Sequence, residues 1–153
     1  MRSGASSRVR ENSAMGLVTV TIKVENYFDW ARAQTATGAR KQRIRTVIIP
    51  DALVDTGTMH LCLPKRYIKA LGLLPLPGKV FAETAKGLVE RTVYGGVVLT
   101  LQGRSDEFSV RELPDNVPAL VGLIPLEALD FVVDPTTQSL VGKHGKKRVM
   151  VMY

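Results

Sequence analysis

The sequence predicts a mainly β protein, and three observations support this prediction. Apolar and polar residues alternate over residues 17–24, as they do in a strand with one buried face. Short apolar runs, separated by turns rich in Gly, Pro and Asp, follow one another along most of the chain. Only residues 64–71 and 125–129 have the composition and boundaries of helices. The expected structure is therefore many short strands with one or two short helices.

The remaining elements follow from alternation and from turn residues. Residues 26–40 have neither period and are expected to be an irregular excursion with a turn at Gly38. Residues 80–94 divide around Ala85-Lys86-Gly87, which predicts a hairpin with Gly at the position that needs positive φ. Further strands are expected at residues 44–49 and 52–54, interrupted by Pro50 and Asp51, and at 61–63, 97–102, 108–113, 119–122, 131–133, 139–141 and 149–152. Loops or turns are expected at residues 73–78, 103–106, 114–118, 134–135 and 143–145.

Length and composition indicate one folded domain. The chain has 153 residues, 45% hydrophobic and 23% charged, and such a chain can bury a sizeable core. No stretch reaches the apolar length of a membrane span, so no membrane association is expected. Residues 1–14 lack the apolar centre of a secretory signal and are expected to be a disordered leader or a tag. Residues 15–153 would then form the domain. The single Cys excludes an internal disulfide and favours the reducing cytoplasm.

The net charge of +7 raises the question of a nucleic-acid partner. No zinc-ligand spacing or RNA-binding motif occurs, and no aromatic residues are interleaved with the basic clusters. Solvated strand edges carry Lys and Arg in the same way. No nucleic-acid partner is therefore expected. The two densest clusters are Arg40, Lys41, Arg43 and Arg45, and Lys143, Lys146, Lys147 and Arg148.

The most informative motif is Asp55-Thr56-Gly57, in the run Ala-Leu-Val-Asp-Thr-Gly-Thr. An apolar strand delivers a carboxylate onto a tight turn, with a hydroxyl and a flexible Gly beside it. Catalysis by paired aspartates needs this local chemistry, and the triplet occurs once in the chain. Since that chemistry uses two carboxylates, the second has to come from another subunit.

The order of these segments resembles the retropepsin-like aspartic proteases, the single-domain family of retroviral proteases and their bacterial and eukaryotic relatives. The resemblance covers roughly residues 17–141 and is strongest at 53–73 and 119–133. It is carried by the Asp-Thr-Gly run, the strand and helix after it, and the hairpin with a small-residue tip. The run that begins at Leu120 and ends at Asp130 is similar to the family's second signature. Small bacterial members are the most similar.

The resemblance implies a closed, barrel-like, retropepsin-type acid protease fold with a flap hairpin. It also implies a homodimer that hydrolyses peptide bonds in peptide or protein substrates, with no cofactor and no metal. Asp55 would be the catalytic carboxylate and Thr56 would hydrogen-bond across the dimer axis. Gly57 and Thr58 would complete the active-site loop. The flap tip would be Ala85, Lys86 and Gly87, and the residues under the loop would be Leu120, Val121 and Gly122.

The implied mechanism follows from electrostatics. Two carboxylates close together cannot both ionise cheaply, so they share one proton. The ionised member deprotonates a water while the protonated member polarises the scissile carbonyl. A symmetric dimer would hold one such site on its two-fold axis.

The sequence departs from the family pattern at Leu123, where retroviral members usually carry an Arg that supports the dimer through an ion pair. The flap tip also has one Gly where the family has several. The alternative function is therefore a catalytically silent module that keeps the protease fold for dimerisation or peptide binding.

Other candidate sites are weaker. His60 and Cys62 could share a strand face as a thiol nucleophile with its base, but a buried Cys is more often inert. His144 lies in a Gly/Lys-rich turn and is expected to be solvated. Two His and one Cys without regular spacing do not predict a metal site. Asp130 and Asp134 are expected to cap or terminate local structure, although either could supply the second carboxylate.

Overall fold

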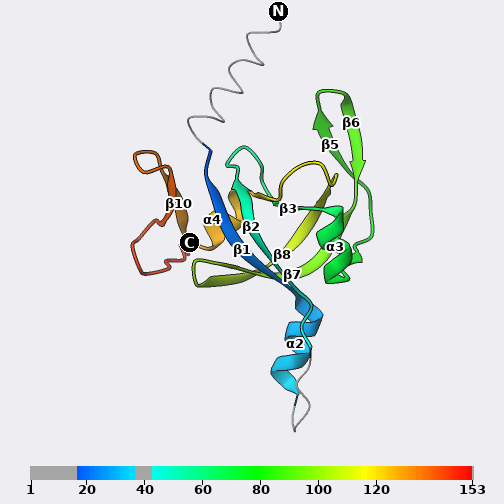
Figure 1. Cartoon of the computed structure of the whole chain (residues 1–153), viewed down its shortest axis with the longest axis horizontal. Coiled ribbons are helices and arrows are strands. Elements are labelled where there is room, and N and C mark those ends of the chain that lie inside the picture. Colours follow the sequence, from blue (N-terminus) through cyan, green and yellow to red (C-terminus); the bar gives the residue numbers. More distant parts are fainter. Residues whose placement is uncertain (1–16, 37–42, 153) are drawn as a thin grey trace, which may run out of the picture.

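The computed structural model describes residues 17–36 and 43–152. The expectations for residues 1–14, for the turn at Gly38 and for the basic residues Arg40 and Lys41 lie outside these ranges. The described helices are α2 (Tyr27–Thr35), α3 (Lys65–Leu71) and α4 (Leu123–Ala128). The described strands are β1 (Thr19–Asn26), β2 (Thr46–Val54), β3 (Leu61–Pro64), β4 (Leu74–Pro75), β5 (Val80–Thr84), β6 (Gly87–Arg91), β7 (Val93–Leu101), β8 (Arg104–Leu113), β9 (Leu120–Val121), β10 (Phe131–Asp134) and β11 (Ser139–Gly142) (Figure 1).

Six of these strands close into a barrel. They are hydrogen-bonded in the order β1-β2-β9-β3-β8-β7, and pairing of β1 with β7 completes the ring. The β2–β9 and β3–β8 pairs are parallel, and the other pairs in the ring are antiparallel. Closure gives each of the six strands a partner on both sides, which removes the exposed edges of an open sheet. The predicted mainly β, closed-barrel fold class is confirmed.

The alternation that predicted β1 is the reason the barrel has a core. Val20, Ile22 and Val24 point inward and are buried, whereas Thr21 and Lys23 face solvent. Complete burial of an aliphatic side chain contributes about 1.5–3 kcal/mol. The same one-sided burial recurs around the ring, and the largest fully buried side chains are Ile22, Ile49, Leu61, Leu63, Leu71, Leu99, Leu101, Leu129, Val24, Val97, Val110 and Val121.

The predicted interruption at Pro50 and Asp51 is a β-bulge within one continuous strand. Val20 pairs with Ala52 but Ile22 pairs with Ile49, so β2 has one residue more than β1 over this interval. A bulge accommodates a residue that has no N–H to donate to the ladder. The prediction of two separate strands is therefore wrong, although the irregularity is where the sequence placed it.

The prediction of an irregular segment after β1 is wrong, because residues 27–35 form α2. The Asn26 side chain accepts a hydrogen bond from the backbone N–H of Asp29 at 3.0 Å, which caps the helix. Tyr27 stacks on Trp30 with ring centroids 5.8 Å apart. Asp29 also binds the Arg45 guanidinium, with Nε 2.7 Å from Oδ2, and this contact fixes α2 to the chain that enters β2.

Boundaries elsewhere are mostly as predicted, with local corrections. α3 follows Pro64 and ends at Gly72, whose φ of 62° is left-handed. Residues 149–152 do not form the predicted strand. The turn predicted at 103–106 is shorter, because β8 already begins at Arg104. The predicted loop at 73–78 contains β4, and α4 begins two residues before the predicted start, at Leu123.

Two hairpins lie outside the barrel. The β5–β6 hairpin has Ala85 and Lys86 in its turn and Gly87 at a φ of 101°, as the sequence predicted. The β10–β11 hairpin follows α4. Figure 1 shows the β5–β6 hairpin and the loop between β2 and β3 at the same end of the barrel, and α2 at the opposite end.

Candidate active site

The Asp55 loop joins two barrel strands that a third strand separates. β9 lies between β2 and β3, with Leu53 opposite Leu120 in the parallel pair and Leu61 opposite Val121 in the antiparallel pair. The backbone N–H of Asp55 donates to the Val121 carbonyl at 3.0 Å. The loop after β2 is therefore anchored to a segment far away in the sequence, and the anchoring residue is the one that carries the carboxylate.

The Asp55 carboxylate is held by its own loop. The backbone N–H of Gly57 donates to Oδ1 at 3.0 Å, and the Thr58 hydroxyl donates to Oδ2 at 3.0 Å. The Thr58 N–H also donates to the Asp55 carbonyl at 3.1 Å, which closes the turn. Asp55 is half-buried, while Thr56 and Gly57 are exposed. Each carboxylate oxygen thus has one donor from the loop and remains at the end of the barrel.

Gly122 allows the downstream segment to lie directly against this loop. A Cβ at Gly122 would lie 2.5 Å from the carbonyl oxygens of both Thr58 and His60, so no larger residue fits without backbone movement. The Leu123 N–H donates to the Thr58 carbonyl at 2.7 Å, and the Ile124 N–H donates to the Met59 carbonyl at 2.8 Å. Residues 58–60 and 122–124 therefore support each other through backbone hydrogen bonds.

The His60–Cys62 pair lacks the character of a thiol nucleophile. Burial raises the pKa of Cys62 to about 11, with Arg111 opposing the shift and Asp55 adding to it. Burial, and then the nearby Arg111, lowers the pKa of His60. At neutral pH the thiol is therefore protonated and the imidazole is neutral, whereas an active thiol requires the thiolate. Cys62 lies in β3 as a buried, free Cys.

His144 is an exposed turn residue, as expected, but it also binds Asp130, which the sequence did not indicate. Its Nδ1 lies 2.8 Å from Oδ2 of Asp130, and the same oxygen accepts the Val149 N–H at 2.9 Å. These contacts, first the Val149 N–H and then His144, lower the pKa of Asp130. Asp134 accepts the Thr136 N–H at 2.9 Å in a local turn. Both aspartates hold local structure together, as the sequence predicted.

The β5–β6 hairpin presents apolar side chains to solvent. Phe81 and Leu88 are 55% and 71% exposed. Its tip is ordered by Thr84, whose hydroxyl donates to the Gly87 carbonyl at 2.8 Å and accepts the Lys86 N–H at 3.2 Å. The hairpin therefore has a defined turn and an apolar surface that no other part of the described chain covers.

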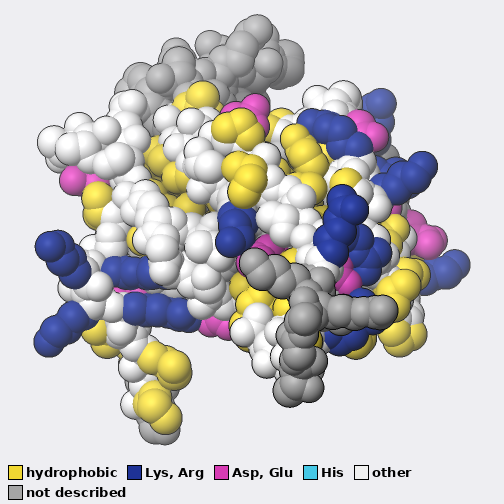
Figure 2. All heavy atoms as spheres, turned by 60° about the horizontal axis from the view of Figure 1, so that its bottom comes forward, with side chains coloured by type: hydrophobic (Ala, Val, Ile, Leu, Met, Phe, Trp, Pro, Cys, Tyr) yellow, Lys and Arg dark blue, Asp and Glu magenta, His cyan; other side chains and the backbone are white. Residues whose placement is uncertain are grey.

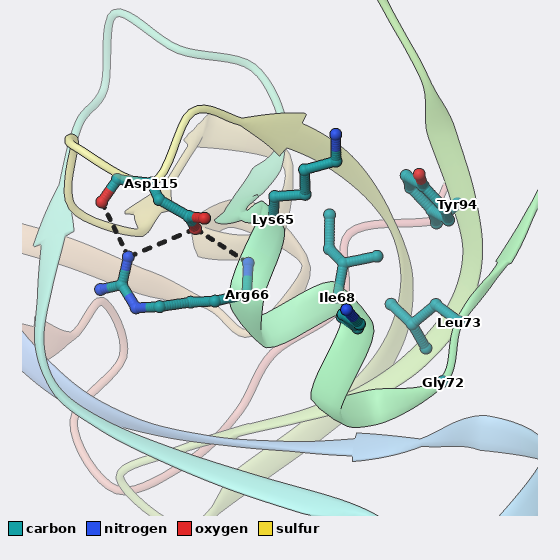
Figure 3. Close-up of a pocket in the computed structure, with 8 residues that line it drawn as sticks. Lys65, Arg66, Ile68, Gly72, Leu73, Tyr94 and Asp115 are labelled. Carbon is teal, nitrogen blue, oxygen red and sulfur yellow. Dashed lines mark hydrogen bonds and ion pairs between the residues drawn. The ribbon is translucent and has the colours of Figure 1, made fainter.

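A cavity of about 670 Å³ lies along α3, away from the Asp55 loop. Figure 3 shows Lys65, Ile68, Leu73 and Tyr94 around it. At its rim the Arg66 backbone N–H donates to Oδ1 of Asp115 at 2.8 Å. No residue of the Asp55 loop or of the β5–β6 hairpin lines this cavity, so it is a separate feature.

The surface gives further limits. Lys and Arg side chains occur in several separated groups on the face in Figure 2, with acidic and hydrophobic side chains between them. Within residues 17–36 and 43–152, no group of three or more His, Cys, Asp or Glu side chains could hold a metal ion. No helix in the described part of the chain has the length and apolar character to cross a membrane.

Comparison with known proteins gives distant likeness among solved structures. No protein-family model and no curated protein matches the chain. Among solved structures, the chain is similar to EIAV protease complexed with the inhibitor HBY-793. The identity is 16%, the match covers 71% of this chain and 84% of that chain, and the TM-score is 0.47. At this level of similarity, function has to be inferred from the residues of the site.

Sequence reasoning placed Asp55, its loop and the hairpin, but it missed Arg111. This residue acts on His60 and Cys62 from β8, which pairs with β3 in parallel. The alternation within β8 indicates which of its residues face away from the core. Nothing local in the sequence indicates that β8 lies beside β3.

Proposed function

We propose that the protein is an aspartic endopeptidase that acts as a homodimer, with one Asp55 from each subunit. The observation that carries this proposal is the half-buried Asp55 carboxylate, whose two oxygens are held by Gly57 and Thr58 on a loop anchored to β9. A general acid–base pair needs carboxylates fixed in orientation and open to substrate, and this loop meets both conditions.

The homodimer supplies the second carboxylate. Asp130 and Asp134 are engaged elsewhere, and the exposed Thr56 and Gly57 leave the end of the loop free to meet a second copy. Two Asp55 side chains on a two-fold axis would share one proton, because two adjacent negative charges repel strongly.

Hydrolysis would then proceed without a covalent intermediate. The ionised Asp55 takes a proton from a water that attacks the scissile carbonyl carbon, while the protonated Asp55 of the second subunit donates to the carbonyl oxygen. Collapse of the tetrahedral intermediate, with a proton passed to the leaving nitrogen, releases the two peptide products. The β5–β6 hairpin would close over the peptide as a flap, with Ala85, Lys86 and Gly87 at its tip, and its exposed Phe81 and Leu88 would become covered. We place this enzyme in the reducing cytoplasm, since Cys62 is a free thiol.

The decisive experiment compares peptide cleavage by the native protein and by Asp55→Asn. The Asn side chain keeps the size of the carboxylate but cannot share the proton, so cleavage should fall by about a thousandfold or more. Asp51→Asn is the matched control, because Asp51 is an exposed aspartate in β2, the strand that leads to Asp55. Products are mapped by mass spectrometry from acidic to neutral pH. Equal cleavage by native protein and Asp55→Asn would refute the proposal.

The alternative function, a silent dimerisation or peptide-binding module, is favoured by Leu123. This half-buried Leu follows Gly122 at the position where an Arg would support the dimer through an ion pair. Sedimentation and peptide binding distinguish the two functions. A folded dimer that binds peptides but leaves every bond intact across the pH range would establish the module.

A further inference from the structure

A row of side chains runs across the outer face of the barrel next to Asp55. Residues paired across neighbouring strands point to the same side of a sheet. Following the pairs from β2 through β9, β3 and β8 to β7 gives this outer row: Leu53, Leu120, Cys62, Arg111 and Val93. The next residues in the same strands are core residues, namely Val54, Val121, Leu61 and Val110. The outer row therefore lies on the side of the sheet that faces away from the core.

The outer row lies between the Asp55 loop and the base of the β5–β6 hairpin. It begins at Leu53, two residues before Asp55, and ends at Val93, two residues after the end of β6. Cys62 and Val93 are buried although neither belongs to the hydrophobic core cluster. Figure 1 shows the loop and the hairpin at the same end of the barrel. An extended peptide placed at Asp55 and covered by the hairpin would cross this row.

Arg111 is the charged member of the outer row. It is close enough to Cys62 to oppose the rise in its pKa, and Asp55 acts on the same thiol. Its guanidinium Nη1 donates to the Ser109 hydroxyl at 2.7 Å, which orients the group along β8. Within the described residues, no carboxylate forms an ion pair with Arg111.

A half-buried guanidinium with one neutral partner has unused binding capacity. Arg has five N–H donors in a planar fork that matches a carboxylate, and such pairs are among the strongest hydrogen bonds in proteins. Several other described Arg side chains bind carboxylates, as Arg45 binds Asp29 and Arg148 binds Asp106, whereas Arg91 and Arg104 donate to backbone carbonyl oxygens. At Arg111 no side chain of the described residues supplies a carboxylate, so most of its donors are open to water or to a ligand.

We propose that Arg111 determines substrate specificity by binding the carboxylate of a Glu or Asp side chain that lies near the scissile bond of an extended peptide. This inference rests on the proposed function. Because a symmetric dimer supplies two copies of Arg111, the acidic preference would apply on both sides of the scissile bond. Lys86 at the hairpin tip, and the basic residues at the end of the barrel opposite the Asp55 loop, take no part in this binding of a substrate carboxylate.

Binding to the inactive protein tests this inference separately from catalysis. Asp55→Asn protein is titrated, by fluorescence anisotropy, with labelled extended peptides in which Glu or Gln is placed at each position in turn. At the positions that face Arg111, the Glu peptide should bind about tenfold or more tightly than the Gln peptide. This ratio should fall to about one in Asp55→Asn/Arg111→Gln, and Arg111→Lys should retain part of it.

Arg43→Gln is the matched control, because Arg43 is exposed and lies just before β2, at the end of the barrel opposite the loop. It should leave the Glu/Gln ratio unchanged. Circular dichroism establishes that each variant is folded. Equal loss of affinity for Glu and Gln peptides in Arg111→Gln would assign Arg111 a structural role and overturn the inference. So would an acidic preference that survives without Arg111, or no peptide binding at all.

Cleavage assays on the same peptides separate the two proposals. Arg111-dependent binding of Glu peptides without Asp55-dependent cleavage would refute the peptidase and retain the specificity residue. Asp55-dependent cleavage with no preference between Glu and Gln would retain the peptidase and refute the role of Arg111 in specificity.

Discussion

The Asp55 loop and the β5–β6 hairpin lie at the same end of the barrel but are built in opposite ways. The loop is bound by backbone hydrogen bonds to β9 and to residues 122–124, and it lies over fully buried Val121. The hairpin is a two-stranded ribbon with exposed side chains and few contacts to the barrel. Isolated two-stranded hairpins are only marginally stable, whereas packed segments open only with the whole domain. A fixed carboxylate and a movable cover are what the proposed chemistry needs.

Substitution of Gly122 should have the largest effect on the difference in stability between the Asp55 loop and the β5–β6 hairpin. In Gly122→Ala the new Cβ meets two backbone carbonyl oxygens, so the free energy of unfolding should fall by about 3 kcal/mol. Urea denaturation measures the loss, and hydrogen exchange should show faster opening of the loop with no change in the hairpin. Gly103→Ala is the control, because a Cβ there meets no atom and only its positive φ of 81° opposes the change, at about 1 kcal/mol. Equal losses in the free energy of unfolding in both variants would show that the two carbonyl oxygens near Gly122 do not exclude a Cβ there.

Breaking the ion pair between Asp29 and Arg45, which holds α2 far from the Asp55 loop, should lower the stability of the domain without loosening that loop. The Arg45 guanidinium holds the pKa of the buried Asp29 well below its usual range, so the ionised form stabilises the fold. Asp29→Asn should cost about 2 kcal/mol at neutral pH. Because the folded-state pKa is depressed, this contribution is present above the ordinary value of 3.8 and is lost as the pH falls further. Melting curves of the native protein and of Asp29→Asn should therefore converge below about pH 4. A constant difference at all pH values would contradict this account.

The Cys62 thiol reports on how well the region beneath the loop is closed. Since its pKa is raised to about 11, alkylation at mildly alkaline pH should be at least about tenfold slower than that of a free thiol. Unfolding in denaturant should restore the ordinary rate. The raised pKa also means that stability declines as the pH rises above the ordinary thiol value of 9.0. Rapid alkylation of the folded protein would show that the loop and the outer row open readily.

A change in the hairpin should have the smallest effect on stability. Leu88 is 71% exposed, so Leu88→Ser should change the free energy of unfolding by less than about 0.5 kcal/mol. If the hairpin covers substrate, the same variant should weaken peptide binding while the melting temperature stays unchanged. Thr137→Ser, at another exposed turn, serves as the control for a neutral surface change. Unchanged peptide binding in Leu88→Ser would remove the hairpin from the binding cleft.

Local signals were sufficient for the features that local chemistry determines. The alternation of β1, the helix between Pro64 and Gly72, the turn at Gly87 and the strand-to-turn step at Asp55 could all be predicted. Each depends on side-chain period or on a residue with a special backbone preference.

The features that sequence reasoning missed depend on distant partners or weak patterns. α2 has no strong apolar stripe, and its one local signal was the Asn26 cap. Residues 149–152 are apolar enough for a strand, but Met150 and Met152 are 77% and 84% exposed and no strand pairs with them. The pairing of His144 with Asp130 joins a turn to the second residue after α4, which neither segment indicates alone.

The position of β9 between β2 and β3 sets an order of events as the chain emerges from the ribosome. Asp55 is made early, yet the carbonyl that receives its backbone N–H belongs to Val121, which is made much later. Until then, the space between β2 and β3 has no strand to fill it and the barrel ring stays open. Long-range closure of this kind is slow and follows synthesis of most of the domain. The carboxylate therefore reaches its final orientation only at a late stage of folding, after the rest of the barrel has been translated.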